Sequence, residues 1–365
     1  MKGVPAAAFF LAVLLAASRL YGAPLEEIRD ILRRHLLNPP GEAALAALSE
    51  ENLPTKLRDI DPYARIFSAA EYRAFTAARH AWVGIGADLS LRGSVPILHV
   101  YRGGPADRAG IPDRSRLLEI DGRPASGLDA ESLAILLKGQ EGTDVHLMVG
   151  LPDGSKARFR LRRESFTPLD VEMVPVGDRH VVRIRDFVGG MTRPALRSIL
   201  NVLFRMDPAH KAARLIVDLR DAPGGDLYEA FDLAGVFLPA GTLLGTIRGR
   251  DGNAVEIRAP QGDKYAMPLI LLVGPETASA AEIFAGVLRH HGRALLVGRT
   301  TFGKCLSQTD LRLSDGSVLR YTNKEVLLPG GESCTGKGLT PDLAVREFEL
   351  DSLPRLVKRA ESLRP

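Results

Sequence analysis

The feature that most limits how this chain can fold is an alternation of strand and helix segments that begins at about Val171. "HVVRIRDF" and "ARLIVDLRD" predict buried strands, and "MTRPALRSILNVLFRMD" between them predicts an amphipathic helix. "MPLILLVG", "SAAEIFAGVLRHHG" and "RALLVG" then repeat the strand–helix–strand order. Strands that alternate with helices form a mostly parallel sheet with helices on its faces. We therefore expect an α/β core, followed by an antiparallel hairpin in "DLRLSDGSVLRYTNKEVLL" with its turn at "SDGS".

The segments before this core have two other patterns. Residues 25–80 carry apolar positions at helical spacing, as in "LEEIRDILRRHLL", and Ser68 with Glu71 forms a capping-box signal. From about Trp82, short alternating segments bounded by glycine, such as "WVGIGADLSL" and "VPILHVYRG", predict strands. One short and one longer helix accompany them, so this part is expected to be a small α+β module.

The amino terminus predicts export. Lys2 is followed by an uncharged run over residues 3–18, and small residues offer cleavage sites after Ser18 or Ala23. This order is typical of a secretory signal peptide. The run is shorter than the roughly 20 residues of a membrane span, which favours cleavage. We expect an exported protein, periplasmic or extracellular, with membrane association through an uncleaved signal as the alternative.

Charge and cysteine content exclude some classes of function. The formal net charge is +4, and no dense Lys/Arg patch interleaved with aromatics is present, so nucleic acid is not expected as a partner. No H-E-x-x-H motif or Cys/His cluster occurs, so we expect no metal and no cofactor. In an exported chain Cys305 and Cys334 are either disulfide partners or two unrelated buried thiols.

Ser279 lies between a predicted buried strand and a predicted helix, which places it at the carboxyl end of a sheet strand. The alanines around it leave its hydroxyl approachable, and the N–H groups that begin the helix can face an oxyanion. Considered alone, Ser279 is better interpreted as a helix N-cap.

Lys304 changes that interpretation, because a serine nucleophile needs a base. A lysine can serve if its pKa falls by about three units from about 10.4, as burial without an acidic partner allows. Residues 300–308 contain no Asp or Glu, and Gln308 offers a neutral hydrogen bond. A solvated loop lysine is the alternative.

The turn at Gly224 and Gly225 supplies a further part. Paired glycines let the backbone approach a ligand and present N–H groups, so with the Ala280 N–H they predict an oxyanion hole, unless this is an ordinary strand-to-helix turn. A Ser-His-Asp triad is disfavoured, because His290 and His291 lie about three helical turns from Ser279. No G-x-S-x-G elbow is present.

On these residues the chain resembles the carboxyl-terminal processing (tail-specific) protease family of serine peptidases with a built-in PDZ domain, over about residues 50–345. The family's S-A-S-A-S-E segment resembles "TASAAE", its T-F-G-K-G resembles "TFGKC", its D-L-R-x-N-P-G-G resembles "DLRDAPGG", and its G-K-G-I-T-P-D resembles "GKGLTPDL". The family lysine follows the serine by 25 residues and the glutamine follows four later, which selects Ser279, Lys304 and Gln308. Gly225 is then favoured over Gly224 as oxyanion donor.

The resemblance implies a multidomain chain of α+β and α/β parts. These are a signal peptide (1–23), an N-terminal helical segment (24–80), a PDZ domain (81–165), a crotonase-like (ClpP-like) Ser/Lys protease core (166–350) and a C-terminal tail (351–365). A PDZ groove binds a peptide as an added strand and holds its terminal carboxylate. The matching segment "VGIGADL" assigns peptide binding to Gly84, Ile85, Gly86, Ala87 and Leu89.

The implied function is an exported serine endopeptidase that takes proteins or peptides with free apolar C-termini and cleaves through an acyl-enzyme on the Ser279/Lys304 dyad. The main alternative is a non-catalytic PDZ scaffold on the same fold, and a crotonase-like acyl-CoA enzyme is disfavoured by the PDZ module and the export signal. Whether the protein forms a homo-oligomer or binds a regulatory partner stays open.

Cys305 replaces the family glycine after the lysine, which suggests that a Cys305–Cys334 disulfide holds the lysine loop in place. Lys138 either links PDZ occupancy to the active site or, as we favour, is a solvated helix end.

Overall fold

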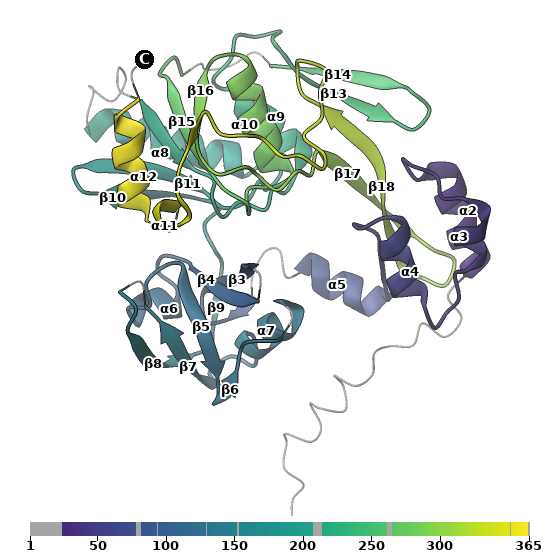
Figure 1. Cartoon of the computed structure of the whole chain (residues 1–365), viewed down its shortest axis with the longest axis horizontal. Helices are drawn as coiled ribbons and strands as arrows, with labels where there is room; N and C mark the ends of the chain where they lie inside the picture. Colours follow the sequence, from purple (N-terminus) through teal and green to yellow (C-terminus); the bar gives the residue numbers. More distant parts are fainter. Residues whose placement is uncertain are drawn as a thin grey trace, which may run out of the picture. The chain divides into compact units, whose positions relative to one another are not determined.

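The computed structural model of the chain describes residues 24–77, 82–92, 94–128, 130–151, 153–206, 214–260, 265–350 and 352–363 (Figure 1). The expected signal peptide lies outside these ranges. The chain divides into two compact units: residues 1–77, 247–255 and 306–325 form the first, and residues 78–246, 256–305 and 326–365 form the second. Within the described ranges, every helix is too short or too polar to cross a membrane.

The first unit packs the N-terminal helices against the predicted hairpin. The hairpin strands pair antiparallel, as expected. Leu313, Leu319 and Tyr321 from the hairpin region share one apolar core with helix residues such as Ile28 and Leu57. The described residues 25–77 are mostly helical, but they also contain a short strand that pairs with the hairpin. The elements are α2 (Leu25–His35), α3 (Glu42–Ala46), α4 (Leu53–Ile60), β1 (Arg65–Phe67), α5 (Ala69–Ala77), β17 (Leu306–Arg312) and β18 (Val318–Leu327).

The Ser68–Glu71 capping box is present at the start of α5. The Ser68 N–H donates to the Glu71 carboxylate at 2.7 Å, and the Glu71 N–H donates to the Ser68 hydroxyl at 3.2 Å. This reciprocal pair satisfies two backbone donors that a helix start otherwise leaves without partners.

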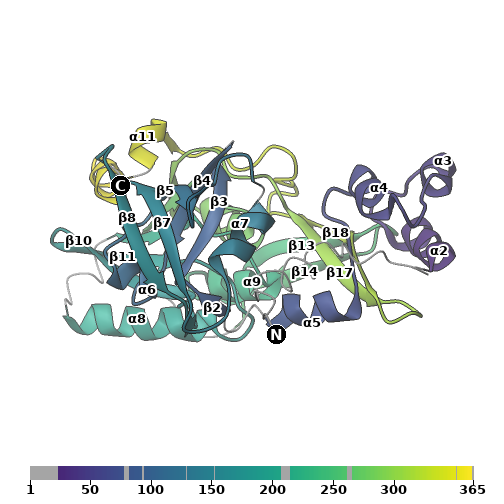
Figure 2. The same ribbon diagram turned by 90° about the horizontal axis from the view of Figure 1, so that it is seen from below.

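The second unit begins with the small α+β module. Its main sheet runs in the order β3-β4-β5-β7-β8, with β6 beside β5, and the strand pairs are antiparallel. Buried side chains such as Leu98, Leu133 and Val145 form its core, and Figure 2 shows α7 beside the sheet. The elements are β2 (Trp82–Gly84), β3 (Ala87–Arg92), β4 (Val95–Val100), α6 (Pro105–Arg108), β5 (Ser115–Ile120), β6 (Arg123–Pro124), α7 (Ala130–Leu137), β7 (Asp144–Gly150), β8 (Lys156–Arg162) and β9 (Glu164–Phe166).

The α/β core follows as a six-stranded sheet in the order β10-β11-β12-β15-β16-β19. The β10–β11 pair is antiparallel and the other four pairs are parallel, so the predicted mostly parallel sheet is present. The sheet and its helices are β10 (Val171–Val176), β11 (Arg179–Ile184), α8 (Thr192–Met206), β12 (Leu215–Asp218), α9 (Leu227–Gly235), β15 (Leu269–Val273), α10 (Ala280–His290), β16 (Ala294–Gly298), β19 (Leu343–Ala344), α11 (Glu347–Leu350) and α12 (Leu353–Glu361). Strands β13 (Leu243–Gly249) and β14 (Ala254–Arg258) belong to the sheet of β1 and β18.

The segment expected as a C-terminal tail contains a packed helix. Leu356, Val357 and Ala360 of α12 are buried against strand residues Ile216 and Ile270 of the core sheet. Their spacing is that of one apolar helix face, so the sequence "LPRLVKRAE" carried a signal for this helix. Helix α12 is therefore part of the protease core and not a separate tail.

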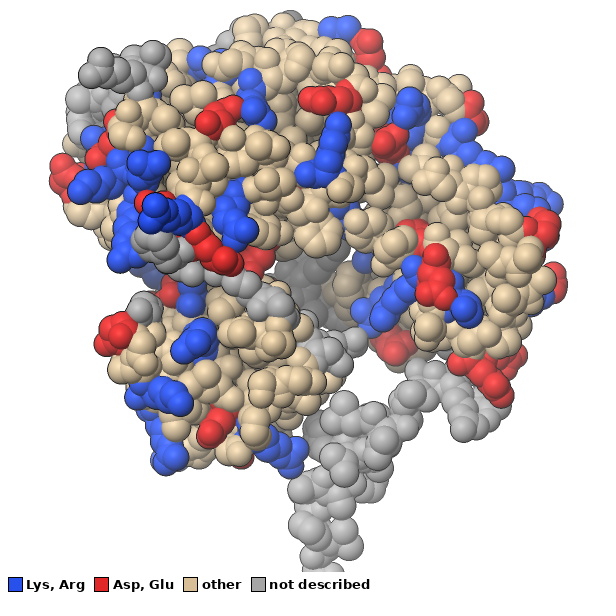
Figure 3. Space-filling model, viewed as in Figure 1, with Lys and Arg blue, Asp and Glu red and all other residues tan. Residues whose placement is uncertain are grey.

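Basic and acidic side chains alternate over the surface seen in Figure 3, and neither sign covers a large area of that face. This agrees with the small net charge of the whole chain.

Candidate active site

Three loops leave the carboxyl ends of three neighbouring parallel strands. Residues 219–226 connect β12 to α9, residues 274–279 connect β15 to α10, and residues 299–305 follow β16. In open α/β sheets this edge is where ligands bind. The loops carry the predicted oxyanion turn, Ser279 and Lys304 in that order.

Ser279 occupies the N-cap position of α10 with φ 54° and ψ −120°. A side chain in this conformation costs about 1–3 kcal/mol, and such strain concentrates at active sites. The loop that precedes it is tied to the oxyanion turn, because the Ala278 N–H donates to the Ala222 carbonyl at 3.0 Å. The Thr277 hydroxyl also donates to the Leu219 carbonyl at 2.7 Å. The two turns are therefore held as one structure.

Gly224 lies against the nucleophile. A Cβ at this position would meet the Ser279 Cβ at 2.8 Å and the Ala280 backbone nitrogen at 2.9 Å, and Gly224 has φ +110°. Both the close approach and the backbone angle require glycine. Gly224, the first of the two glycines predicted to approach a ligand, thus lies against Ser279 itself.

The two N–H groups predicted to hold an oxyanion are Gly225 and Ala280. Within the described part of the chain, neither donates a hydrogen bond to another protein group. Gly225 is fixed by its neighbours, since Phe187 donates to the Gly224 carbonyl at 2.9 Å and accepts from the Asp226 N–H at 2.6 Å. Donors that are fixed and unused are suited to stabilising a developing negative charge.

Glu282, one turn into α10, connects the serine and lysine loops. Its carboxylate is fully buried, and its Oε2 accepts the Ser279 N–H at 2.9 Å and the Lys304 N–H at 2.8 Å. Its Oε1 accepts the Thr301 hydroxyl at 2.5 Å and the Gly303 N–H at 2.7 Å. Sequence analysis assigned no role to Glu282, although it is the glutamate of the "TASAAE" segment.

The lysine loop is also tied to the segment that follows β18. Cys305 and Cys334 form a disulfide with both residues buried, which is the pairing hypothesised from the sequence. Hydrogen bonds accompany it: Gly336 donates to the Gly303 carbonyl at 3.0 Å, and Leu339 donates to the Thr301 hydroxyl at 2.7 Å. The backbone on both sides of Lys304 is therefore fixed.

Two other residues named from the sequence lie outside these three loops. Gln308 is on β17 in the first unit, where its Nε2 donates to the Thr322 hydroxyl at 3.3 Å. His291 follows the C-terminal end of α10, and its Nε2 contacts the Leu243 carbonyl at 2.7 Å.

A buried charge network supports the oxyanion turn from the end of β12. Both oxygens of Asp218 accept from the Arg220 guanidinium at 2.8 Å, and one accepts from Arg183 at 3.0 Å. Burial alone would raise the pKa of Asp218, but Arg220 and Arg183 hold that pKa far below its ordinary value. Asp218 is thus a paired carboxylate rather than a candidate acid or base.

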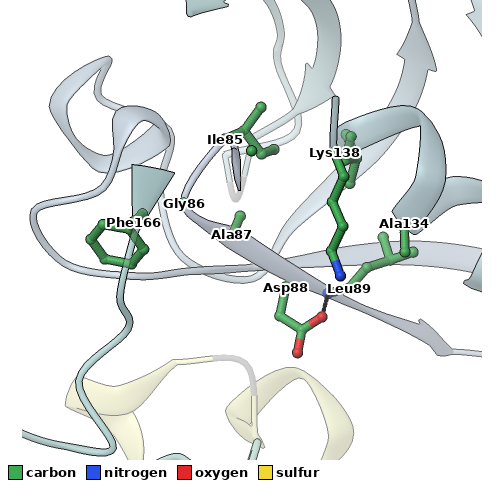
Figure 4. A pocket seen from close by; sticks show the side chains of 10 residues that line it. Ile85, Gly86, Ala87, Asp88, Leu89, Ala134, Lys138 and Phe166 are labelled. Carbon is green, nitrogen blue, oxygen red and sulfur yellow. Dashed lines mark hydrogen bonds between the residues drawn. The ribbon is translucent and has the colours of Figure 1, made fainter. Parts of the chain in front are cut away.

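A pocket lies in the α+β module at the place where the sequence predicts a peptide groove (Figure 4). All five residues assigned from the sequence line one pocket, together with residues of α7 and with Phe166. Gly86 has φ +68° and its backbone lies against Gly104, so a side chain would not fit in this loop. The lining residues are Gly84, Ile85, Gly86, Ala87, Asp88, Leu89, Ala134, Leu137, Lys138 and Phe166.

Two family models match parts of the chain. Residues 180–345 match the family model of peptidase family S41, and residues 97–149 match a PDZ domain. The chain is 28% identical over 336 residues to a probable CtpA-like serine protease of Staphylococcus aureus, covering 90% of this chain and 66% of that protein. A counterpart from Staphylococcus saprophyticus is 29% identical over 300 residues, covering 80% of this chain and 59% of that protein. The chain thus spans about two thirds or less of the length of these relatives.

Solved structures share the fold. A photosystem II D1 C-terminal processing protease superposes with a TM-score of 0.64 at 23% identity, covering 91% of this chain and 98% of that one. Mature CPAF in complex with lactacystin superposes with a TM-score of 0.53 at 12% identity, covering 92% and 96%. The multidomain fold expected from the sequence, with a PDZ domain and a protease core, is confirmed.

Proposed function

The chain belongs to peptidase family S41, the serine-type C-terminal processing proteases, and from that premise we propose that it is an exported endopeptidase with a Ser279/Lys304 dyad. Neutral Lys304 removes the proton from the Ser279 hydroxyl, and the Ser279 oxygen attacks the carbonyl carbon of the scissile peptide bond. The Gly225 and Ala280 N–H groups hold the resulting oxyanion. Lys304 returns the proton to the departing amine, and water then hydrolyses the acyl-enzyme.

The observation that carries this proposal is the position of Glu282. One carboxylate oxygen accepts the N–H groups of both Ser279 and Lys304, so the backbones of the two dyad residues meet at a single atom. Two residues 25 positions apart are thereby held at the same edge of the sheet, beside two unused N–H donors. A strained serine, a fixed lysine loop and an oxyanion site together support acyl transfer.

The substrates we propose are proteins or peptides with free apolar C-termini. The pocket along β3 supports this choice, because an extended peptide can add to that strand while the loop at Gly86 receives its carboxylate. Export is proposed from the N-terminal sequence alone, and the Cys305–Cys334 disulfide is compatible with an oxidising compartment.

Cleavage of an unfolded protein with an apolar C-terminus tests the proposal. Wild type should cleave it, and Ser279→Ala and Lys304→Ala should each lower the rate by at least about 1,000-fold. Ser307→Ala is the matched control, since it removes a nearby serine outside the dyad and should cleave normally. Intact-mass measurement of wild type during turnover should detect the acyl-enzyme on Ser279.

Two results would reject the dyad. One is cleavage by Ser279→Ala at the wild-type rate, and the other is an active Lys304→Ala variant. If wild type binds tail peptides but cleaves nothing, the non-catalytic PDZ scaffold becomes the better description.

A further inference from the structure

A series of side-chain hydrogen bonds in the first unit ends at Gln308. The Gln308 Nε2 donates to the Thr322 hydroxyl at 3.3 Å, and that hydroxyl donates to Asp61 Oδ1 at 3.1 Å. Asp61 Oδ1 also accepts the Tyr63 N–H at 3.0 Å, and Asp61 Oδ2 accepts the Thr322 N–H at 2.7 Å. Asp61 and Thr322 are both buried. We call Asp61, Thr322 and Gln308 the amide relay.

The direction of each hydrogen bond in the amide relay follows from Asp61. An ionised carboxylate only accepts hydrogen bonds, and both Asp61 oxygens accept backbone N–H groups. The Thr322 hydroxyl therefore gives its one hydrogen to Asp61 and can only accept from Gln308. Because the NH₂ end of the Gln308 amide is its only donor, that end faces Thr322. The carbonyl oxygen of the amide is turned away from Thr322.

A β-bulge places Gln308 opposite Thr322. The register of the β17–β18 pair shifts between Ser307, which lies opposite Lys324, and Gln308, which lies opposite Thr322. Asn323 is therefore the extra residue, and its side-chain oxygen is buried without a hydrogen-bond partner in the described part of the chain. In an unbroken ladder Gln308 would lie opposite Asn323 instead. Bulges re-aim side chains and are common beside active sites, so this irregularity is suited to forming the amide relay.

The orientation of the Gln308 amide decides whether its partner lysine can act as a base. A neutral lysine amine has two hydrogens and one lone pair, and only the lone pair can take the proton of Ser279. A carbonyl oxygen accepts one of the amine hydrogens and leaves the lone pair for the serine. An amide NH₂ group would donate to the lone pair and occupy it. Only one of the two orientations of the amide therefore suits the reaction.

We propose that Asp61 and Thr322 are positioning residues that fix the Gln308 amide with its carbonyl oxygen toward the base. Asp61 holds the Thr322 hydroxyl, and the hydroxyl holds the NH₂ end of the amide, which leaves the carbonyl end for Lys304. The inference rests on the proposed function, in which Ser279 and Lys304 form the dyad, and on the sequence assignment of Gln308 as the partner of Lys304.

A purely structural role for Asp61 is the competing interpretation. Asp61 follows the last residue of α4, and its contact with the Thr322 N–H joins this helix to the hairpin. That contact uses the backbone, whereas the positioning role needs the Thr322 hydroxyl. Thr322→Val separates the two roles, because it removes the hydroxyl, keeps the branched shape and leaves both backbone N–H contacts of Asp61 in place.

The test measures kcat and KM of the full-length protein on an unfolded, apolar-tailed protein. We expect Gln308→Ala to lower kcat by about tenfold or more and Thr322→Val by about threefold or more, with KM within about twofold. Thr322→Ser, which retains the hydroxyl, should recover most of the kcat that valine loses. In the Gln308→Ala background Thr322→Val should lower kcat no further, because the hydroxyl acts only through the amide.

Asp61→Asn should reverse the hydrogen-bond directions of the amide relay. Its new NH₂ group can donate to the Thr322 hydroxyl, whose hydrogen is then available to the carbonyl oxygen of Gln308. The amide would then turn its NH₂ end toward Lys304. We therefore expect kcat to fall further than in Thr322→Val, by about tenfold or more.

Thr309→Val is the matched control. Thr309 follows Gln308 on β17 and lies opposite Tyr321, and successive side chains of a strand face opposite sides. Its kcat should stay within about twofold of wild type. Melting curves should show that every variant is folded at the assay temperature.

Three results would overturn the amide relay. They are a kcat for Thr322→Val within about twofold of wild type, an equal loss of kcat in Thr309→Val, and a further loss when Thr322→Val is added to Gln308→Ala. Failure of the proposed function looks different, because Ser279→Ala or Lys304→Ala would then still cleave. Failure of the relay alone leaves both of these dyad variants inactive.

Discussion

The Glu282 carboxylate accepts a hydrogen bond from the Ser279 N–H, so the nucleophile is held by a buried residue three positions further along α10. Each carboxylate oxygen of Glu282 accepts hydrogen bonds from two donors, and the glutamate itself is fully buried. Glu282→Gln therefore loses two acceptor contacts whichever way its amide is turned. At about 1.5–3 kcal/mol for each hydrogen bond to a charged group, we expect a loss of at least about 3 kcal/mol in unfolding free energy. The urea midpoint measures it, and kcat should fall by about tenfold or more.

Glu229→Gln is the matched control for that variant. Glu229 is also a buried glutamate that accepts backbone N–H groups, those of Gly190 and Arg193, and these two hydrogen bonds do not involve the serine or lysine loops. It should lower stability while kcat per folded molecule stays near wild type. If Glu282→Gln and Glu229→Gln lower kcat equally, Glu282 has no specific role in the active site.

Gly224→Ala should disable the site through a direct clash. Its new Cβ would meet the Ala278 carbonyl and the Ser279 Cβ at 2.8 Å, so the two turns must separate. We expect a fall in kcat of about 100-fold, because displaced oxyanion donors are costly. Gly241→Ala is the control: its φ is +80° but nothing lies within 4 Å of the added carbon. It should lose about 1–2 kcal/mol of stability and keep its activity, whereas normal activity of Gly224→Ala would contradict the close approach.

Replacing both cysteines by serine should lower the unfolding free energy by about 2–4 kcal/mol. The disulfide closes a loop between positions 29 residues apart, and both sulfurs are buried in the folded protein. A reductant should therefore leave the folded wild type intact and act only on unfolded molecules. Mass spectrometry of the non-reduced protein should find it lighter by two hydrogens than the reduced form. Free thiols in the folded wild type would refute the pairing.

Acid should destabilise the protein partly through Asp218. Burial opposes its charge, but Arg220 and Arg183 hold the folded-state pKa far below the ordinary value of 3.8. The unfolded chain then binds a proton that the folded chain does not, so stability is fully present above about pH 4 and falls as the pH drops below it. Asp218→Asn should be less stable at neutral pH and should show a shallower loss between about pH 4 and pH 2. If the unfolding free energy of Asp218→Asn falls with pH as steeply as that of wild type in this acid range, the prediction is wrong.

The sequence predicted the local parts of this fold well, because they depend on nearby residues. The apolar run before Ser279, the helix after it and the hairpin turn at "SDGS" all follow from short-range patterns. The spacing between Ser279 and Lys304 placed both on loops after neighbouring strands, which is where the structure has them.

Contacts between distant segments could not be predicted in the same way. Nothing in the sequence near Glu282 indicates that its carboxylate accepts donors from residues 301–304. The buried pair of Arg114 and Asp221 joins positions from different domains, and arginine alone gives no sign of burial. The packing of the hairpin against the N-terminal helices is likewise a long-range result, visible only when Leu319 and Ile28 are found in one core.

The Cys305–Cys334 bond has a mechanical consequence. Cys305 is the last residue of the second unit before the chain enters the β17–β18 hairpin of the first unit, and residues 326–334 bring it back. The bond closes the base of this excursion, and the Val326 N–H reinforces it by donating to the Cys305 carbonyl at 2.9 Å. Tension applied to the hairpin is therefore carried by a covalent link one residue away from Lys304. The two ends of this excursion can separate only if that covalent bond is broken.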